Sequence, residues 1–149
     1  MKIDRQTGTL VREGVPSIIN PEDKNAIEEA LRLKASDEDA KVTVLSMGPL
    51  QAESALREAL SMGADRAILL SDKAFAGADT LATSYLLSVA IRKIAAYDLI
   101  LCGGQTIDGE TGQVGPQLAE WLALPQATHA EEIKVEGNRV SVRSHFENV

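Results

Sequence analysis

The sequence predicts an α/β fold in which an open parallel sheet carries helices on both faces and a β-hairpin follows near the C-terminus. Short runs rich in Val, Ile and Leu alternate with longer segments whose apolar residues recur at a spacing of about 3.6. The short runs are typical of strands buried on both faces. Their alternation with helical segments implies parallel strands joined by right-handed crossovers.

Three runs are predicted to be strands, because each is short, apolar and bounded by Gly, Asp or Ser: Val42–Ser46, Ala67–Leu70 and Leu99–Cys102. The segments with helical spacing begin at Asn20-Pro21, run from Gly48-Pro49 to Gly63, cover residues 79–95, and cover residues 113–122. Asn can cap a helix, Pro suits the first helical position, and Gly can end a helix. Finally, Ile133–Glu136 and Arg139–Val142 alternate apolar and polar residues around Gly137-Asn138, which predicts a hairpin.

The composition excludes several classes of function. The 149 residues suit one domain, residues 1–149, and 44% hydrophobic residues can form a core. A formal charge of -7 and 3% aromatic residues argue against nucleic-acid binding, which needs clustered cations or stacking rings. No apolar stretch is long enough to span a membrane, nothing resembles a signal peptide, and the single Cys102 fits a reducing compartment. We therefore expect a cytoplasmic protein without membrane contact.

The most informative segment is the glycine-rich stretch Cys102–Pro116, which leaves the end of a predicted strand and opens a helix. Ligands of open parallel sheets bind at this edge, because helix N-termini and loop amides converge there. Five glycines would let the backbone approach a ligand closely, and the polar side chains that could hold a ribose or phosphate are Asp108, Glu110, Thr111 and Gln113. The alternative is a mobile loop without a ligand. The glycine spacing matches neither a P-loop nor the dinucleotide fingerprint.

Two further strand ends can face the same edge. Ser46–Pro49 either borders an adenine or is an ordinary strand-to-helix loop, and the pattern alone does not decide. Asp79 is suited to capping the following helix, and the residues alone favour capping over ligand contact for Thr80 and Thr83 as well. No catalytic or metal-binding constellation is present, since the two histidines have no ligand spacing and Cys102 is interpreted as a buried, inert thiol.

Three blocks in the chain resemble electron transfer flavoprotein beta subunits. They are residues 17–34 (SIINPEDKNAIEEALRLK), 62–66 (MGADR) and 104–116 (GQTIDGETGQVGP), and the resemblance extends in order over the whole chain. It implies a Rossmann-like subunit that pairs with an FAD-bearing alpha subunit as a heterodimer. Such a subunit carries electrons rather than acting as an enzyme, and it holds AMP or, in the electron-bifurcating branch, a second FAD.

The resemblance also implies which residues bind the nucleotide. The segment 76–83 (AGADTLAT) is similar to the bifurcating branch, in which Thr80 and Thr83 would reach the flavin. With this resemblance, flavin contact and helix capping are equally favoured as the role of these two threonines. The implied cofactor-binding residues are Asn20, Asp23, Met47, Thr80, Thr83, Gly103, Gln105, Asp108, Gly109, Glu110, Thr111, Gly112, Gln113 and Val114.

The chain departs from the family pattern in three places. The family's first apolar strand would precede Ile3-Asp4, and the arm and loop that contact the alpha subunit and partner dehydrogenases would follow Val149. We therefore interpret the chain as truncated at both ends, with the first family strand missing. Glu110 stands where Asp is commoner. A stand-alone adenine-nucleotide-binding regulatory module of the universal-stress type remains the alternative function.

A missing first strand has a structural consequence, because the family order places it between the strands corresponding to Val42–Ser46 and Leu99–Cys102. Inner strands without a neighbour leave backbone amides and carbonyls without hydrogen-bond partners, which lowers the stability of the fold. The gap could close if those two strands pair directly, if the head near Thr9–Arg12 inserts, or if a second chain contributes a strand. We expect direct pairing or filling by a second chain, and therefore poor stability or self-association.

Overall fold

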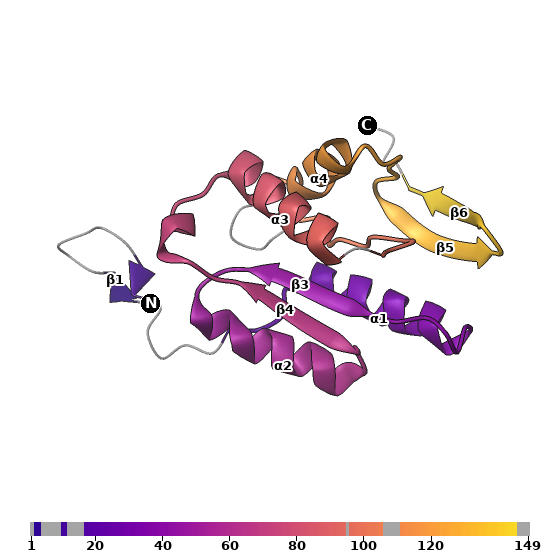
Figure 1. The fold of residues 1–149 in the computed structure, drawn as a ribbon, viewed down its shortest axis with the longest axis horizontal. Coiled ribbons are helices and arrows are strands. Elements are labelled where there is room, and N and C mark those ends of the chain that lie inside the picture. The colour runs from indigo at the N-terminus through magenta and orange to yellow at the C-terminus, as the bar shows by residue number, and fades with distance from the viewer. Residues whose placement is uncertain (1, 4–9, 12–16, 95, 106–110, 146–149) are drawn as a thin grey trace.

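The computed structural model describes residues 2–3, 10–11, 17–94, 96–105 and 111–145 of the chain (Figure 1). Its helices are α1 (Pro21–Ala35), α2 (Glu53–Met62), α3 (Thr80–Ile94) and α4 (Val114–Leu122), with short 3₁₀ turns at Leu50–Ala52 and Lys73–Phe75. Its strands are β1 (Lys2–Ile3), β2 (Leu10–Val11), β3 (Thr43–Met47), β4 (Arg66–Leu70), β5 (Ala130–Glu136) and β6 (Arg139–Ser144). None of these described helices is long and apolar enough to cross a membrane.

The centre of the fold is a parallel pair of strands. β3 and β4 run side by side in register from Thr43 opposite Arg66 to Met47 opposite Leu70. α2 connects them and packs on both strands, and it ends at Gly63, whose φ of 125° is accessible to glycine but not to most other residues. The predicted α/β class, the first two strands and the four helices are confirmed.

Helices cover the strand pair from two sides. In Figure 1, α2 lies below β3 and β4, whereas α3 lies above them with α4 at its side. The predicted hairpin is also confirmed, because β5 and β6 pair antiparallel with Ile133 opposite Val142 and turn at Gly137, whose φ is 59°. Asp79 accepts a hydrogen bond from the Ala82 N–H at 2.8 Å, as expected of a residue that caps α3.

The prediction of a third strand is wrong in the described part of the chain. Leu99–Cys102 belongs to no strand there, and β3 pairs only with β4. Direct pairing of this run with β3, one of the two outcomes that we favoured, is therefore not observed. The head does not insert through Leu10–Val11 either, because β2 pairs with β1. An apolar composition predicts burial, but a strand also needs a neighbour at hydrogen-bonding distance.

The described interior is hollow along β3. Few of its apolar residues are buried, namely Leu56, Ala59, Ala64, Ile91, Leu118 and Ile133, and none of them lies on α1. A cavity of about 1920 Å³ takes the place of a core between β3, α1, α3 and the run Leu99–Cys102.

Polar contacts, rather than apolar packing, hold α1 against the rest of the fold. Lys34 donates from Nζ to Asp65 Oδ1 at 2.8 Å and to the Gly63 carbonyl at 3.1 Å. The other carboxylate oxygen of Asp65 accepts the Val42 N–H at 2.8 Å. Lys24 pairs with Glu58 of α2 at 3.0 Å. One carboxylate, Asp65, thus joins the end of α1 to the start of β3, and its replacement tests this anchor.

Replacing Asp65 with Asn should lower the free energy of unfolding at neutral pH, and the difference from the parent should shrink in acid. The Lys34 ammonium, followed by the Val42 N–H, holds the pKa of Asp65 below its ordinary value of 3.8. The folded state therefore favours the carboxylate. This stabilisation is complete above pH 3.8 and is lost as the pH falls through the lower folded-state pKa. Urea unfolding followed by circular dichroism at neutral and acidic pH measures it.

The matched control is Asp39→Asn, because the Asp39 side chain forms no hydrogen bond or ion pair with any described residue. It should change stability little at any pH. A constant difference between parent and Asp65→Asn across the whole pH series would contradict a role for the Asp65 charge.

Candidate nucleotide site

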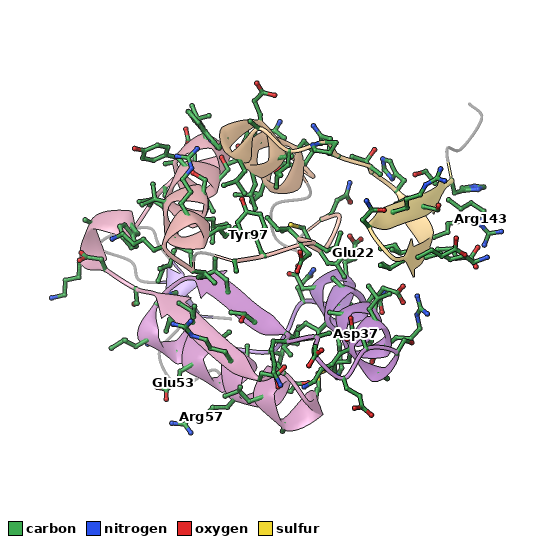
Figure 2. The ribbon with its side chains drawn as sticks, turned by 45° about the vertical axis from the view of Figure 1, so that its right-hand side comes forward. Glu22, Asp37, Glu53, Arg57, Tyr97 and Arg143 are labelled. Atoms are coloured by element: carbon green, nitrogen blue, oxygen red, sulfur yellow. The ribbon has the colours of Figure 1, made fainter. Side chains whose placement is uncertain are left out.

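The first turn of α1 is joined to the segment that begins the glycine-rich loop. The Gly103 N–H donates to Asp23 Oδ1 at 3.0 Å, and the Gln105 N–H donates to Glu22 Oε2 at 2.6 Å. Asn20 Nδ2 donates to the Gln105 carbonyl at 2.8 Å. Figure 2 shows Glu22 where α1 meets this segment. Residues about 80 positions apart in sequence thus form one polar cluster, at the edge where β3 ends.

Asn20 occupies the predicted position but has a different role. It precedes α1 as its N-cap residue, yet its side chain makes no capping hydrogen bond. The amide instead fixes the loop carbonyl of Gln105. Our expectation that the Asn20 side chain caps the helix is therefore wrong. Glu22 was not predicted as a site residue, although it lies inside the first family-like block, because sequence alone does not show that its carboxylate reaches the loop.

Gly103 allows the close approach of the loop to α1. A Cβ atom at this position would lie 2.5 Å from Asp23 Oδ1 and 2.7 Å from the Asp23 backbone nitrogen. At Gly104 a Cβ would meet only the flexible end of Glu22, with Oε2 at 2.8 Å. Gly112 has a φ of +60°, a conformation that glycine adopts readily, and a Cβ atom there would lie 3.4 Å from the Gly104 carbonyl oxygen. Gly103 is thus required for the approach of the loop to α1, and Gly112 for its backbone conformation, whereas the expected approach of these glycines to a ligand stays a prediction.

A chain of side-chain hydrogen bonds connects α3 to α4 behind the loop. Thr80 Oγ1 donates to Gln113 Oε1 at 3.0 Å and accepts from Gln117 Nε2 at 3.4 Å. Gln117 Oε1 in turn accepts from the fully buried Ser84 at 3.2 Å, and Ser84 accepts from Trp121 Nε1 at 3.1 Å. Thr80 therefore holds the loop residue Gln113 in addition to lying in the first turn of α3. Neither Ser84 nor Gln117 was predicted from the sequence, although Ser84 lies one turn after Thr80.

The structure brings most of the predicted binding residues to one cavity, the same one that runs along β3. Its lining includes Asn20, Asp23, Met47, Thr83, Gly103, Gln105, Thr111, Gly112, Gln113 and Val114. Thr80 is connected to them through Gln113. Asp108, Gly109 and Glu110 lie outside the described residues. No described cluster of His, Cys, Asp and Glu has the composition of a metal site.

The prediction that Cys102 is buried is wrong. It lines the cavity and is exposed to it. Surrounding atoms still exclude enough water to raise the pKa of the thiol, and the negative charge of Asp23 raises it further. The thiol form is therefore favoured over the nucleophilic thiolate.

Comparison with known proteins gives a consistent result. The family model of the electron transfer flavoprotein domain matches residues 7–148. The chain is 58% identical to the electron transfer flavoprotein subunit beta of Thermoanaerobacterium thermosaccharolyticum over 99% of its own length and 56% of the relative. It is 52% identical to a caffeyl-CoA reductase-Etf complex subunit, CarD, of Acetobacterium woodii, over 99% of this chain and 56% of that one.

A more distant relative is the FixA protein of Azorhizobium caulinodans, at 51% identity over 89% of this chain and 48% of the relative. The chain thus spans about half the length of the relatives that it matches.

Replacing Gly103 with Ala should lower the free energy of unfolding by about 1–3 kcal/mol, the usual cost of forcing an extra methyl group into a packed contact. The methyl group would press on the Asp23 backbone, which cannot move without shifting α1. Gly104→Ala is the matched control and should change stability by no more than about 0.5 kcal/mol, because the Glu22 side chain can turn away. Urea denaturation compares the two, and equal losses would contradict the proposed contact.

Proposed function

The chain belongs to the electron transfer flavoprotein beta subunit family, and from this membership we propose that it binds an adenine nucleotide, FAD or AMP, in the cavity edge around Gly103–Gln113. We propose further that it pairs with an FAD-bearing alpha-type subunit and serves as an electron carrier between dehydrogenases and acceptors. A bound flavin would supply the electron chemistry, and the protein would bind and orient it.

One observation carries the proposal. The polar first turn of α1, the end of β3 at Met47, and the segments 103–105 and 111–114 all line one cavity. Open α/β sheets bind ligands outside the carboxyl ends of their strands, where loop amides and helix N-termini supply donors. The start of α4 at Val114 provides such a helix end, and the Gly103 and Gln105 amides provide loop donors.

The donor set fits a phosphate-containing ligand with one competing feature. The Gly103 and Gln105 amides already donate to the carboxylates of Asp23 and Glu22. A phosphate at these amides would replace an acceptor of the same charge sign. Glu22 is the more easily displaced carboxylate, because Gln105 is exposed and the Glu22 side chain is flexible. We infer that a ligand phosphate would take the place of the Glu22 carboxylate at the Gln105 amide.

The proposal of an alpha-type partner is supported by the names of the relatives. One relative is named a subunit of a caffeyl-CoA reductase-Etf complex, and others are named beta subunits. A beta subunit implies a complementary subunit. For this chain we propose the same kind of pairing.

Analysis of the bound ligand tests the proposal directly. The chain is purified alone and with a co-expressed alpha-type subunit of the same family, and the nucleotide released by denaturation is identified by mass spectrometry. The proposal is supported if the chain purified alone releases FAD or AMP, or if the pair releases a nucleotide beyond the one FAD of the alpha-type subunit. ATP released from a colourless protein would support the regulatory module instead, and no nucleotide from the chain alone together with one FAD per pair would contradict binding by this chain.

Replacing Glu22 with Ala should strengthen AMP binding about fivefold. The change frees the Gln105 N–H and removes a negative charge beside it, and one hydrogen bond is worth about 1 kcal/mol net. Isothermal titration calorimetry measures the dissociation constant. Glu53→Ala is the control, because Glu53 pairs with Arg57 on the outer side of α2, as Figure 2 shows. Weaker AMP binding by Glu22→Ala would show that Glu22 helps to hold the ligand.

Replacing Thr83 with Val should separate the two candidate ligands. Thr83 lines the cavity from α3, and the family resemblance implies that its side chain would reach a flavin. Loss of its hydroxyl should weaken FAD binding about fivefold, the effect of one hydrogen bond, and leave AMP binding unchanged. Fluorescence titration with FAD and calorimetry with AMP measure both constants. Thr128→Val, at an exposed position outside the cavity, is the control. Equal losses for both ligands would contradict a contact specific to the flavin.

A further inference from the structure

The facing sides of α3 and α4 carry polar residues at intervals of four. Thr80 and Ser84 lie one turn apart on α3, and Gln113 and Gln117 lie one turn apart at the start of α4. Residues four apart on a helix share one face. Figure 1 shows α4 at the side of α3, and side-chain hydrogen bonds join the two faces. We call these four residues, together with Trp121 one turn after Gln117, the polar seam.

The polar seam is anchored in the interior of the protein. Ser84 is fully buried, and its hydroxyl hydrogen is shared between the Leu81 carbonyl at 2.9 Å and Gln117 Oε1 at 3.2 Å. The Ser84 oxygen also accepts the indole N–H of Trp121 at 3.1 Å. Ser84 thus joins the two helices at a point from which water is excluded, and it holds Gln117 from the buried side.

The hydrogen bonds of the polar seam run in one direction, from the interior to the loop. Ser84 donates to Gln117 Oε1, and Gln117 Nε2 donates to Thr80 Oγ1 at 3.4 Å. Thr80 has one hydroxyl hydrogen, which it donates to Gln113 Oε1 at 3.0 Å. Hydrogen bonds aligned in this way polarise one another. The amide oxygen of Gln113 is therefore occupied, and its NH2 group is the polar part of the side chain left for a ligand.

Gln113 stands where the proposed site favours a phosphate. It lines the cavity, and it directly precedes α4, whose first amides favour an anion. Its side chain makes no capping hydrogen bond, so the side chain is oriented by Thr80 instead. Gln117 and Ser84, in contrast, lie outside the lining of the cavity.

We propose that Gln117 is a positioning residue of the nucleotide site. Through Thr80 it fixes the side chain of Gln113 with the NH2 group toward a phosphate oxygen of the ligand. An NH2 group is a donor, whereas the amide oxygen in the same place would face the phosphate oxygen as a second acceptor. The orientation of one amide thus decides whether Gln113 attracts or repels a phosphate. This inference rests on the proposed function and names the residues that orient one donor of the same site.

A comparison of AMP with adenosine isolates the phosphate contact, because the two ligands differ only in the phosphate. Gln117→Leu removes both bonds of Gln117 in the polar seam and keeps a side chain of similar size. It should weaken AMP binding to the full chain about fivefold, the effect of one hydrogen bond, and leave adenosine binding unchanged. Isothermal titration calorimetry measures both dissociation constants. The emission of Trp121, the single tryptophan, should stay as in the parent, because its bond to Ser84 is kept.

Arg92→Met is the matched control, because Arg92 also joins α3 to α4 through a hydrogen bond to the Trp121 carbonyl. Arg92 lies in the last turn of α3, about 18 Å from Thr80 at 1.5 Å per residue, so salt screens its charge from the site. The variant should unfold at lower urea concentration and bind AMP and adenosine as the parent does. Equal weakening of AMP binding by Gln117→Leu and Arg92→Met would indicate a general effect of helix packing and would overturn the proposal.

A second set of variants tests the path through Thr80. Thr80→Val should weaken AMP binding by the same factor as Gln117→Leu, whereas Thr80→Ser keeps the hydroxyl and should bind AMP as the parent does. The double variant Thr80→Val with Gln117→Leu should lose no more than either single variant, because both break the same chain of hydrogen bonds. Losses that multiply in the double variant would overturn the proposal. Equal AMP affinities of Thr80→Val and Thr80→Ser would do so even if Gln117→Leu did not fold.

The outcomes separate this inference from the proposed function. If the parent and Gln117→Leu bind AMP with the same affinity, the positioning role is overturned and the nucleotide site stands. If the parent binds neither AMP nor FAD, both are overturned.

Discussion

The structure depends on the polar anchoring of α1, because this helix borders both the strand pair and the candidate site without burying a residue. At the C-terminal end of α1, the Asp65 carboxylate accepts hydrogen bonds from Lys34 and from the Val42 N–H. At the N-terminal end of α1, the carboxylates of Asp23 and Glu22 accept hydrogen bonds from the loop amides. Exposed ion pairs contribute at most about 1 kcal/mol each, so α1 is held more weakly than a helix with a packed apolar face. Anything that fills the space beside α1 therefore changes the position of the site as well as the stability of the fold.

The sequence predicted the local elements well and the long-range pairing less well. Helix boundaries followed from signals such as Asn20-Pro21 and Gly63, and the hairpin followed from Gly137-Asn138, since these depend on local backbone preference. The run 99–102 has the composition of a strand, but strand formation depends on a neighbour that composition does not specify. The side-chain roles of Asn20 and Glu22 were missed for a similar reason, because each bonds to a residue more than 80 positions away.

The candidate site combines groups of opposite electrostatic preference. Loop amides and the start of α4 favour an anion, whereas Glu22 and Asp23 place negative charge at the same amides. The two carboxylates supply hydrogen-bond acceptors to both amides. This arrangement would reduce the net free energy gained on binding, since the phosphate of the proposed ligand would replace an existing charged acceptor. The chain from Thr80 through Gln113 and Gln117 to Ser84 has no such conflict, and it fixes the far side of the loop through a fully buried hydroxyl.

The site and the unfilled interior belong to one cavity, and this links ligand binding to folding. A nucleotide that contacts Gly103–Gln105 and Gln113 would bridge α1, α4 and the run 99–102, which few apolar contacts join. A ligand that binds only the folded state stabilises it by RT ln(1 + [L]/Kd), or about 2.7 kcal/mol at a concentration of 100 Kd. That amount is a large share of the 5–15 kcal/mol typical of a domain. Since the described core is this small, the proposed nucleotide would contribute to holding these elements together.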